Sequence, residues 1–256
     1  MLNPNFSIFN DNMFVQVRQL LCDVALQTNE ELLDVTVGEP RMPPPAWFND
    51  RLTVESKNWQ AYPKASADQA FLDDLSVYFK SRFPALADQF DLSEHIVPVP
   101  GTREPLHLLG YCVQGAKQDS VALVTNPFYH AWRAGALIAG GDIVYINAAV
   151  EHEFMPSLEE LDQDVLARCN ILYLCNPSNP HGKIASADYL AHALKLAREF
   201  NFLLVVDECY IDIWRQTCPV SALEVAIKLA SVDYQQGGND PFSHLIVLNS
   251  LSKRSN

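Results

Sequence analysis

The chain has 256 residues, of which 48% are hydrophobic and 19% are charged, a composition typical of a globular protein with one large domain or one domain and part of a second. With 18 Lys and Arg residues against 31 Asp and Glu residues, the formal net charge is −13. Nucleic acids and anionic membranes are bound through a basic face, so we expect neither as a partner.

The N-terminus and the cysteines narrow the class of protein further. The first 14 residues carry neither a basic region nor an apolar stretch, so they do not read as a signal peptide, and no apolar run approaches the length of a membrane span. The six cysteines include no CxxC pair, which argues against a zinc site or a disulfide framework. We therefore expect a cytoplasmic protein that binds no metal.

The first ninety residues predict an arm, a linker and a helix. Three successive prolines, at positions 43–45, predict an extended linker after an N-terminal helical arm. The segment QAFLDDLSVYFKSRF (69–83) follows and predicts an amphipathic helix.

From about residue 95, short apolar runs alternate with helical patterns. The runs are rich in Val, Ile and Leu and are apolar at successive positions, which is typical of strands buried on both faces. They lie at residues 121–127, 142–147, 171–177, 202–208 and 244–250. The segment 186–200 has its apolar residues at helical spacing, and 232–243 predicts a polar loop. Strands separated by helices predict βαβ units, and therefore an α/β fold with a mainly parallel sheet covered on both sides.

Polar residues follow four of these runs, where the strands should end. The strings are NPFY (126–129), NPSNP (176–180), DECY (207–210) and SLSK (250–253), and GTRE (101–104) adds a glycine turn that opens a helix. Because ligands bind at the carboxyl ends of the strands in an open parallel sheet, we expect these residues to face one crevice.

These residue types match the needs of pyridoxal phosphate. The cofactor requires a lysine amine for its aldehyde, a carboxylate for its pyridine nitrogen, donors for its phenolic oxygen, an aromatic face, and hydroxyls and helix-start amides for its phosphate. Taken singly, Asp207 could be a capping carboxylate, Lys253 a surface lysine and Tyr129 a core aromatic. Asn179 could be only a turn residue and Thr102 only a helix start. The spacing alone leaves both interpretations open.

Three sequence motifs, in a fixed order along the chain, indicate a known family. NPSNPHG (176–182), VVDECY (205–210) and SLSKRSN (250–256) resemble the signature of class I/II, or fold type I, pyridoxal-phosphate aminotransferases. NPFYHAW, VGEP and PGTREPL extend the resemblance over nearly the whole chain. Within that family the likeness is greatest to the succinyldiaminopimelate aminotransferases of lysine biosynthesis.

The resemblance implies a role at the cofactor ring for five residues. Lys253 would hold the cofactor as a Schiff base and then move the proton at the substrate's α-carbon. Asp207 would pair with the pyridine nitrogen, Asn179 and Tyr210 would bond the phenolic oxygen, and Tyr129 would stack on the ring.

The remaining implied roles concern the phosphate and the substrate. Thr102 and Arg103, chiefly through backbone N–H groups, and Ser250 would hold the phosphate. Gly38 would lie beside the substrate, and Tyr62 would reach the phosphate in a partner subunit. His181 departs from the family, which usually has a threonine at that position.

The resemblance also implies the organisation of the chain. Residues 46–256 would form a cofactor-binding large domain, a three-layer α/β/α sandwich around a mostly parallel sheet, cut short after the lysine. Residues 1–45 would be the arm and linker, part of a small domain. The chain stops three residues after Lys253, so we expect the C-terminal third of a usual family member to be absent from it.

We therefore expect a fragment of a homodimeric aminotransferase that acts on small amino acids and 2-oxo acids. The favoured reaction transfers an amino group between glutamate or 2-oxoglutarate and N-succinyl-diaminopimelate. The fragment is expected to be inactive alone, because the arginine that grips the substrate carboxylate would lie beyond Asn256. Two alternatives stay open: a non-catalytic remnant that binds the cofactor, and a fold-type-I relative such as a carbon–sulfur lyase.

Overall fold

The computed structural model describes residues 13–22, 24, 33, 35–62, 67–86, 89–233 and 240–254, and the chain divides into two units, residues 1–38 and 39–256. Helix α1 (Met13–Leu21) belongs to the first unit. The second unit begins with the extended proline linker, in which Pro45 has φ −55° and ψ 140°, followed by α2 (Ala46–Glu55). The domain boundary predicted after residue 45 stays a prediction.

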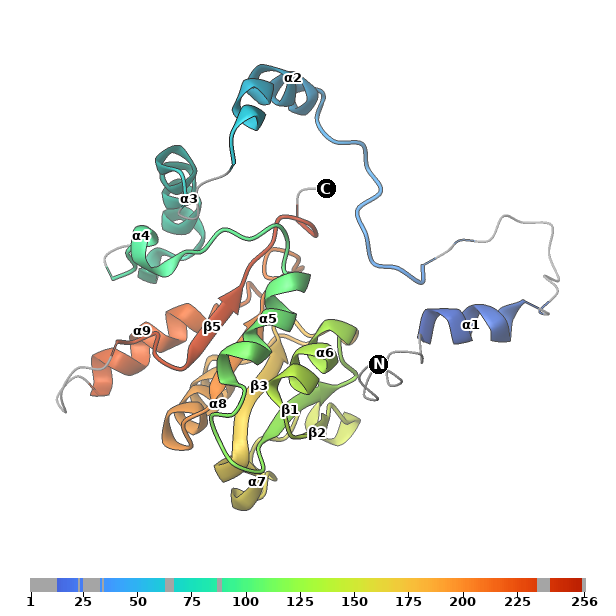
Figure 1. The fold of residues 1–256 in the computed structure, drawn as a ribbon, viewed down its shortest axis with the longest axis vertical. Coiled ribbons are helices and arrows are strands. Elements are labelled where there is room, and N and C mark those ends of the chain that lie inside the picture. Colours follow the sequence, from blue (N-terminus) through green and yellow to red (C-terminus); the bar gives the residue numbers. More distant parts are fainter. Residues whose placement is uncertain are drawn as a thin grey trace. The chain divides into compact units, whose positions relative to one another are not determined.

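The second unit is built on a five-stranded sheet in which all neighbouring strands are parallel (Figure 1). The strand order is β2-β1-β3-β4-β5, and one strand overlaps each predicted apolar run, although β3 begins two residues before its run. The order reverses direction between β1 and β3, which is the position where ligands gather in open α/β sheets. The strands are β1 (Val121–Asn126), β2 (Asp142–Asn147), β3 (Cys169–Cys175), β4 (Leu203–Asp207) and β5 (Leu245–Leu248).

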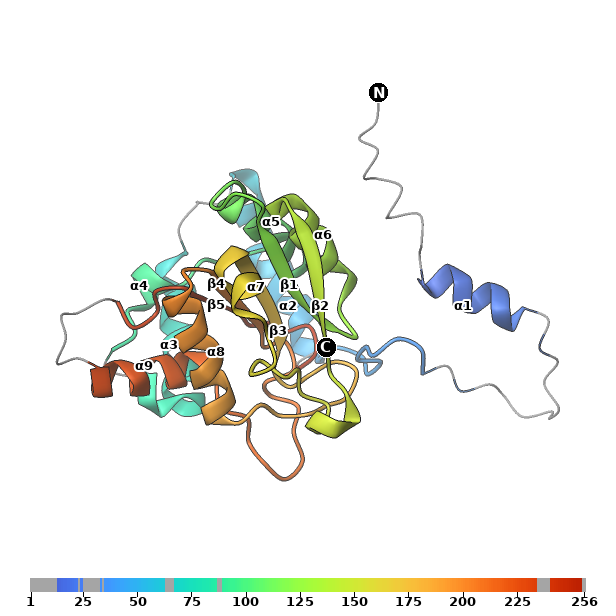
Figure 2. The ribbon, with the colours of Figure 1, turned by 90° about the horizontal axis from the view of Figure 1, so that it is seen from below.

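Helices cover both faces of this sheet, because successive strand residues point to opposite sides. Leu123 and Leu172 belong to one buried cluster, which they share with α8 (Ala187–Glu199) and α9 (Ala222–Asp233). Val124 and Tyr173 belong to a second cluster, together with α5 (Arg103–Val113) and α6 (His130–Ala139). Figure 2 shows the two helix pairs on opposite sides of the strands. The predicted three-layer sandwich is confirmed.

Capping residues explain where the two predicted helices begin. Ser186 precedes α8 and its hydroxyl accepts a hydrogen bond from the Tyr189 amide at 3.1 Å. Asp68 precedes α3 (Gln69–Arg82) and its carboxylate accepts one from the Ala70 amide at 2.9 Å. Both helices match the predicted segments within one or two residues.

One predicted loop begins later than expected. Helix α9 continues through Asp233, so the prediction of a loop from residue 232 is wrong by two residues. Neither Val232 nor Asp233 is a glycine or proline that would end a helix. Residues 234–239, the middle of that loop, lie outside the described residues. The short helices are α4 (Leu92–His95) and α7 (Gln163–Arg168), with 3-10 turns at Ser56–Gln60, Pro84–Leu86 and Val150–His152.

Helices α5 and α6 pack closely because glycines lie at their crossing. A Cβ atom on Gly135 would overlap the carbonyl oxygen of Leu106 and the hydroxyl of Tyr173, and a Cβ on Gly110 would overlap the Gly135 carbonyl oxygen. The Tyr173 hydroxyl donates a hydrogen bond to the Leu106 carbonyl at 3.0 Å across this contact. These contacts fix α5 and α6 against the centre of the sheet. Within the described ranges, no helix is long and apolar enough to cross a membrane.

Candidate active site at the carboxyl ends of the strands

Strand register brings the predicted site residues to one edge of the sheet. Asp207, the last residue of β4, lies beside Cys175 of β3 and Leu248 of β5. The segments that follow these three strands therefore start side by side, and they carry Asn179, Tyr210 and Lys253 between them.

Asp207 is a buried carboxylate with few hydrogen-bond donors. It is 5% exposed, and burial raises its pKa. The Cys209 thiol opposes this shift most strongly. The Cys209 amide, which donates to the Asp207 Oδ1 atom at 3.2 Å, and the nearby indole N–H of Trp132 act in the same direction. No hydrogen bond of good geometry joins that indole to a described residue, although the nitrogen is buried. Burial of a carboxylate is costly unless hydrogen-bond donors or a cationic partner offset it.

Asn179 and Tyr210 form a pair next to this carboxylate. The Asn179 Nδ2 atom donates to the Tyr210 hydroxyl oxygen at 3.1 Å. Burial raises the pKa of Tyr210 to about 12, and the neighbouring Cys175 and Asp207 add to the shift. The phenol therefore keeps its proton at neutral pH and can donate it in a hydrogen bond, as the side chain of Asn179 also can.

Lys253 lies on the turn that follows β5 and faces the same cluster. Its Nζ atom is 6.0 Å from the centre of the Tyr210 ring. Burial raises the pKa of the Cys209 thiol, and the positive charge of Lys253 opposes that shift. The Ser250 hydroxyl accepts a hydrogen bond from the Ser252 amide at 3.1 Å, and the two hydroxyl oxygens are 2.7 Å apart. The turn therefore presents an amine and two hydroxyls near Tyr210.

The start of α5 contributes an anion-binding arrangement. Gly101 has φ 108°, a conformation that favours glycine, and the next residue, Thr102, is the N-cap of α5. The Thr102 side chain does not cap α5; its hydroxyl lies 3.3 Å from the Cys209 Sγ atom instead. The amides of the first helical turn donate no hydrogen bond to the side chain of the cap residue, so they suit a phosphate.

Arg103 and Tyr129 join the start of α5 to the start of α6. The Arg103 Nε atom donates to the Tyr129 hydroxyl at 3.1 Å, so the side chain has a role that the backbone-based prediction did not include. Burial lowers the pKa of His130, and the neighbouring Arg103 and His107 act in the same direction. Arg103 therefore places a positive charge at this corner, beside the carboxylate of Glu104 in the same turn of α5.

Two residues to which the resemblance gives a role, Gly38 and Tyr62, are not part of the site as described above. Gly38 belongs to the first unit, where a Cβ atom on it would meet nothing within 4 Å, and Tyr62 is 99% exposed. Their roles beside the substrate and at a partner's phosphate stay predictions. His181, which replaces the usual threonine, stacks on Phe154 with ring centres 4.9 Å apart.

Sequence reasoning missed Trp132 and Cys209 as neighbours of the site. Trp132 lies three residues after Tyr129 on α6, so helical spacing could have placed it on the sheet-facing side. Cys209 contacts Thr102 and shares its neighbourhood with Lys253, and no spacing pattern in the sequence indicates this. The structure brings together seven predicted residues with these two: Thr102, Arg103, Tyr129, Asn179, Asp207, Tyr210 and Lys253, with Ser250 on the lysine turn.

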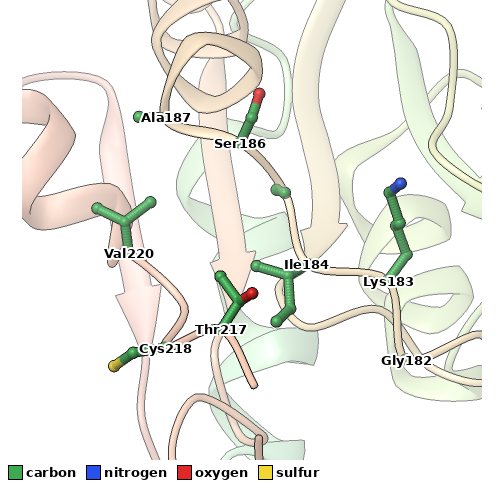
Figure 3. Close-up of a pocket in the computed structure, with 9 residues that line it drawn as sticks. Gly182, Lys183, Ile184, Ser186, Ala187, Thr217, Cys218 and Val220 are labelled. Atoms are coloured by element: carbon green, nitrogen blue, oxygen red, sulfur yellow. The ribbon is translucent and has the colours of Figure 1, made fainter. Parts of the chain in front are cut away.

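A separate hollow of about 480 Å³ lies between the segment that leads into α8 and the segment before α9 (Figure 3). Its lining includes no carboxylate and no aromatic ring, and its lysine, Lys183, pairs with Glu153. Among the described residues, no group of three or more His, Cys, Asp or Glu side chains could hold a metal. The cluster around Asp207 is therefore the candidate site, and a small cavity of about 20 Å³ lies beside it, against Asn179 and His181.

Known proteins resemble this chain in both sequence and fold. Residues 30–256 match the family described as aminotransferase class I and II. The LL-diaminopimelate aminotransferase of Dehalococcoides mccartyi is 25% identical over 215 residues, covering 83% of this chain and 54% of that protein. The enzyme of the same name from Desulforudis audaxviator is 26% identical over 218 residues, covering 84% and 54%. The chain thus spans about half the length of these curated relatives.

Solved structures agree with the sequence match. The aminotransferase AspB of Helicobacter pylori superposes with a TM-score of 0.80 and 27% identity, covering 94% of this chain and 60% of that one. An aminotransferase of Neisseria meningitidis gives a TM-score of 0.82 and 25% identity, covering 94% and 59%.

Proposed function

Since the chain belongs to the class I and II aminotransferase family, whose cofactor is pyridoxal phosphate, we propose that the whole protein is a pyridoxal-phosphate-dependent aminotransferase. One observation carries the proposal. A buried carboxylate, Asp207, ends a strand beside the hydrogen-bonded Asn179–Tyr210 pair and within the neighbourhood of the Lys253 amine. This combination supplies the charge, the donors and the nucleophile that the cofactor needs.

The residues around Asp207 would hold the cofactor ring. Pyridoxal phosphate, when bound, supplies an aldehyde for amines and a ring that accepts electrons from the substrate's α-carbon. Asp207 would keep a proton on the pyridine nitrogen, since the pair of charges relieves the cost of burying the carboxylate. Asn179 and Tyr210 would donate to the phenolic oxygen, and Tyr129, held by Arg103, would cover one face of the ring.

Two further groups complete the arrangement. The first-turn amides of α5, at Thr102 and Arg103, and the hydroxyl of Ser250 would hold the phosphate. Lys253 would carry the cofactor on its Nζ atom and, once displaced by an amino acid, would accept and return the proton at the substrate's α-carbon. Gly38 would line the substrate side of the site in the whole protein.

For the substrate, we infer a diaminopimelate-type amino acid with glutamate or 2-oxoglutarate as the exchange partner. The sequence motifs and the names of the relatives indicate different diaminopimelate substrates. Sequence motifs favour N-succinyl-diaminopimelate, while the relatives carry the name LL-diaminopimelate aminotransferase. We retain N-succinyl-diaminopimelate, in lysine biosynthesis, as the specific proposal, and a homodimer as the working assembly. Glutamate formed from 2-oxoglutarate with each compound as donor would decide between them.

Covalent attachment of the cofactor tests the central assignment. The chain is incubated with pyridoxal phosphate, reduced with borohydride and weighed intact against its mass of 28.7 kDa. We expect one pyridoxyl group, mapped by peptide mass to Lys253, and its loss in Lys253→Ala. Lys183→Ala removes a lysine that is already paired with Glu153 and should keep the adduct.

The outcomes separate the proposal from its alternatives. An adduct that survives Lys253→Ala would contradict the assignment. Attachment at Lys253 without amino transfer by the whole protein would indicate a non-catalytic cofactor-binding protein. Release of a thiol from a sulfur-containing amino acid, without transfer to 2-oxoglutarate, would indicate a carbon–sulfur lyase.

A further inference from the structure

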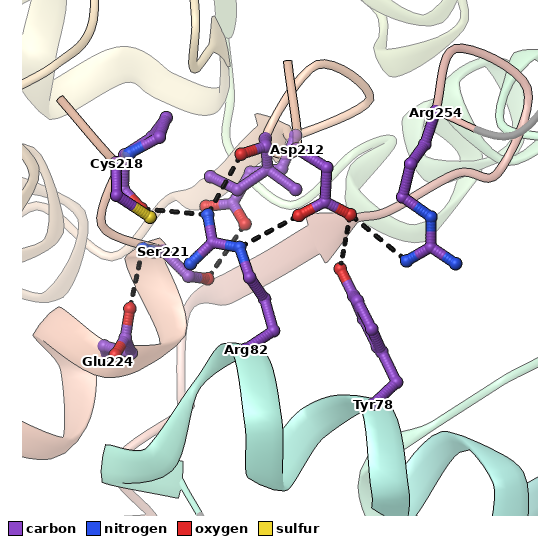
Figure 4. A network of polar contacts seen from close by, with 10 residues as sticks. Tyr78, Arg82, Asp212, Cys218, Ser221, Glu224 and Arg254 are labelled. Atoms are coloured by element: carbon purple, nitrogen blue, oxygen red, sulfur yellow. Dashed lines mark hydrogen bonds and ion pairs between the residues drawn. The ribbon is translucent and has the colours of Figure 1, made fainter. Parts of the chain in front are cut away.

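Asp212 is held in place by two residues of α3. The Tyr78 hydroxyl donates to Asp212 Oδ2 at 2.9 Å, and Arg82 Nε donates to Oδ1 at 2.9 Å (Figure 4). Arg82 also donates to the carbonyl oxygens of Ile211 and Pro219, at 3.0 and 3.1 Å. The side chains of both Arg82 and Asp212 are 15% exposed, so this is a mostly buried ion pair rather than a solvated one.

Arg254 is the third donor to the same carboxylate. Its Nη1 atom lies 3.2 Å from Asp212 Oδ2, and its guanidinium carbon lies 4.6 Å from the centre of the Tyr78 ring. The Arg254 amide also donates to the Leu251 carbonyl oxygen at 3.1 Å, which closes the turn. The guanidinium is therefore held by a carboxylate and by an aromatic face.

These contacts connect the two segments that carry the candidate site. Asp212 lies on the segment after β4, two residues beyond Tyr210 and five beyond Asp207. Arg254 lies on the segment after β5, next to Lys253. Figure 4 shows Arg254 and Arg82 reaching Asp212 from different sides, with Tyr78 between them.

We propose that Arg254 is a positioning residue for Lys253: its pairing with Asp212 holds the lysine turn against the segment that carries Asp207 and Tyr210. This inference rests on the proposed function, because it assumes that Lys253 is the residue that receives the cofactor. Arg254 itself takes no part in the chemistry.

The contacts also decide which variant is informative. If the Arg254 side chain is removed, the Asp212 carboxylate keeps its hydrogen bonds from Arg82 and Tyr78, so we expect the second unit to fold normally. If Asp212 is removed, the mostly buried Arg82 loses its counter-charge, and a folding defect would obscure the result. Arg254→Gln is therefore the test, and Arg215→Gln, which removes an exposed arginine from the segment that follows Asp212, is the matched control.

Two measurements on the same protein distinguish positioning from binding. The first is the rate constant for attachment of pyridoxal phosphate to Lys253, trapped with borohydride at timed intervals. The second is the dissociation constant of pyridoxamine phosphate, which has the same ring and phosphate but cannot link to a lysine. We expect Arg254→Gln to slow attachment at least about 10-fold, because a nucleophile displaced by about an ångström loses much of its effectiveness. The pyridoxamine phosphate constant should change less than about 3-fold, within the effect of one exposed charge.

Arg254→Lys supplies the rescue. A lysine can still pair with Asp212 but cannot stack a planar guanidinium on Tyr78, so its attachment rate should fall between wild type and Arg254→Gln. Far-UV circular dichroism and the Arg215→Gln rate exclude a general loss of structure.

Each other outcome overturns the inference. An unchanged attachment rate in Arg254→Gln shows that the turn needs no anchor. An equal loss in both measurements shows that Arg254 binds the cofactor itself. If wild type fails to attach the cofactor at Lys253, the proposed function fails, whereas attachment by wild type and Arg254→Gln at equal rates removes only this inference.

Discussion

Glu208 should make the stability of the chain fall as the pH rises. Its side chain is 1% exposed and accepts hydrogen bonds from the Ser221 hydroxyl and the Ala222 amide, each at 2.8 Å. Burial raises the pKa of Glu208 to about 8 from its ordinary value of 4.5, although these two donors oppose the shift. In the folded chain near neutral pH, the carboxyl group therefore keeps a proton that the unfolded chain releases.

The direction and the magnitude of the change in the free energy of unfolding follow from the linkage between protonation and folding. Between pH 4.5 and 8 unfolding releases a proton, so higher pH favours the unfolded chain. The stabilisation from the protonated group is complete below pH 4.5 and is lost as the pH rises towards 8. Each pH unit within this window costs about 1.4 kcal/mol. From pH 5 to pH 7, the contribution of Glu208 to the free energy of unfolding should fall by about 2 to 3 kcal/mol.

Urea unfolding followed by circular dichroism at pH 5, 6 and 7 measures this loss. Glu208→Gln cannot ionise, so the free energy of unfolding of the variant should fall less with pH than that of wild type, by the amount given above. Glu199→Gln makes the same change at an exposed position and should keep the wild-type slope. Parallel profiles for wild type and Glu208→Gln would refute the reasoning, because they would mean that Glu208 is already ionised in the folded chain.

Three further predictions concern packing and the cofactor. Gly135→Ala should lower the free energy of unfolding by about 1 to 3 kcal/mol, because the new Cβ atom would overlap the Leu106 carbonyl oxygen. Gly38→Ala, where a Cβ atom meets nothing within 4 Å, should leave the free energy of unfolding unchanged. Equal effects of the two substitutions would contradict the close contact of α5 and α6. Tyr173→Phe should cost about 1 kcal/mol in the same assay through its lost hydrogen bond to Leu106, and an unchanged value would mean that the bond contributes nothing. Asp207→Asn should raise the dissociation constant of pyridoxal phosphate about 10-fold or more in an absorbance titration, and wild-type affinity would remove its assigned role.

The strands could be predicted because the information for them is local. Residues 171–175, ILYLC, are apolar at every position because this part of β3 is buried on both faces, and no tertiary contact is needed to see that. The position of Asp207 follows directly, because a polar residue that ends such a run must lie at the carboxyl end of the sheet. The start of α8 was equally accessible through Ser186.

The anchor of the lysine turn could not be predicted in this way. Asp212 is separated from Tyr78 and Arg82 by 134 and 130 residues, and no spacing rule connects an α3 side chain with a segment after β4. Which residues meet there depends on how α3 packs on the sheet. The same holds for the bond between Arg103 and Tyr129, which needs the crossing of α5 and α6 to be known.

Asp207 and Glu208 show how a structure separates a functional carboxylate from a structural one. They are adjacent, both are buried, and burial raises the pKa of both, so neither exposure nor the direction of the shift tells them apart. Their hydrogen bonds do. Glu208 faces the start of α9 and receives two short hydrogen bonds from Ser221 and Ala222, so its own chain satisfies it.

Asp207 receives one longer bond from the Cys209 amide, and the Cys209 thiol and the buried indole of Trp132 lie close enough to lower its pKa without forming a bond as short as those of Glu208. A buried carboxylate whose donors are this weak is costly unless something else neutralises it, and in the proposed function a cationic ring nitrogen does so. The two amide substitutions should therefore have opposite signatures. Asp207→Asn should act mainly on cofactor affinity and Glu208→Gln mainly on the pH dependence of unfolding, and an exchange of these two effects would show that hydrogen-bond satisfaction is the wrong criterion.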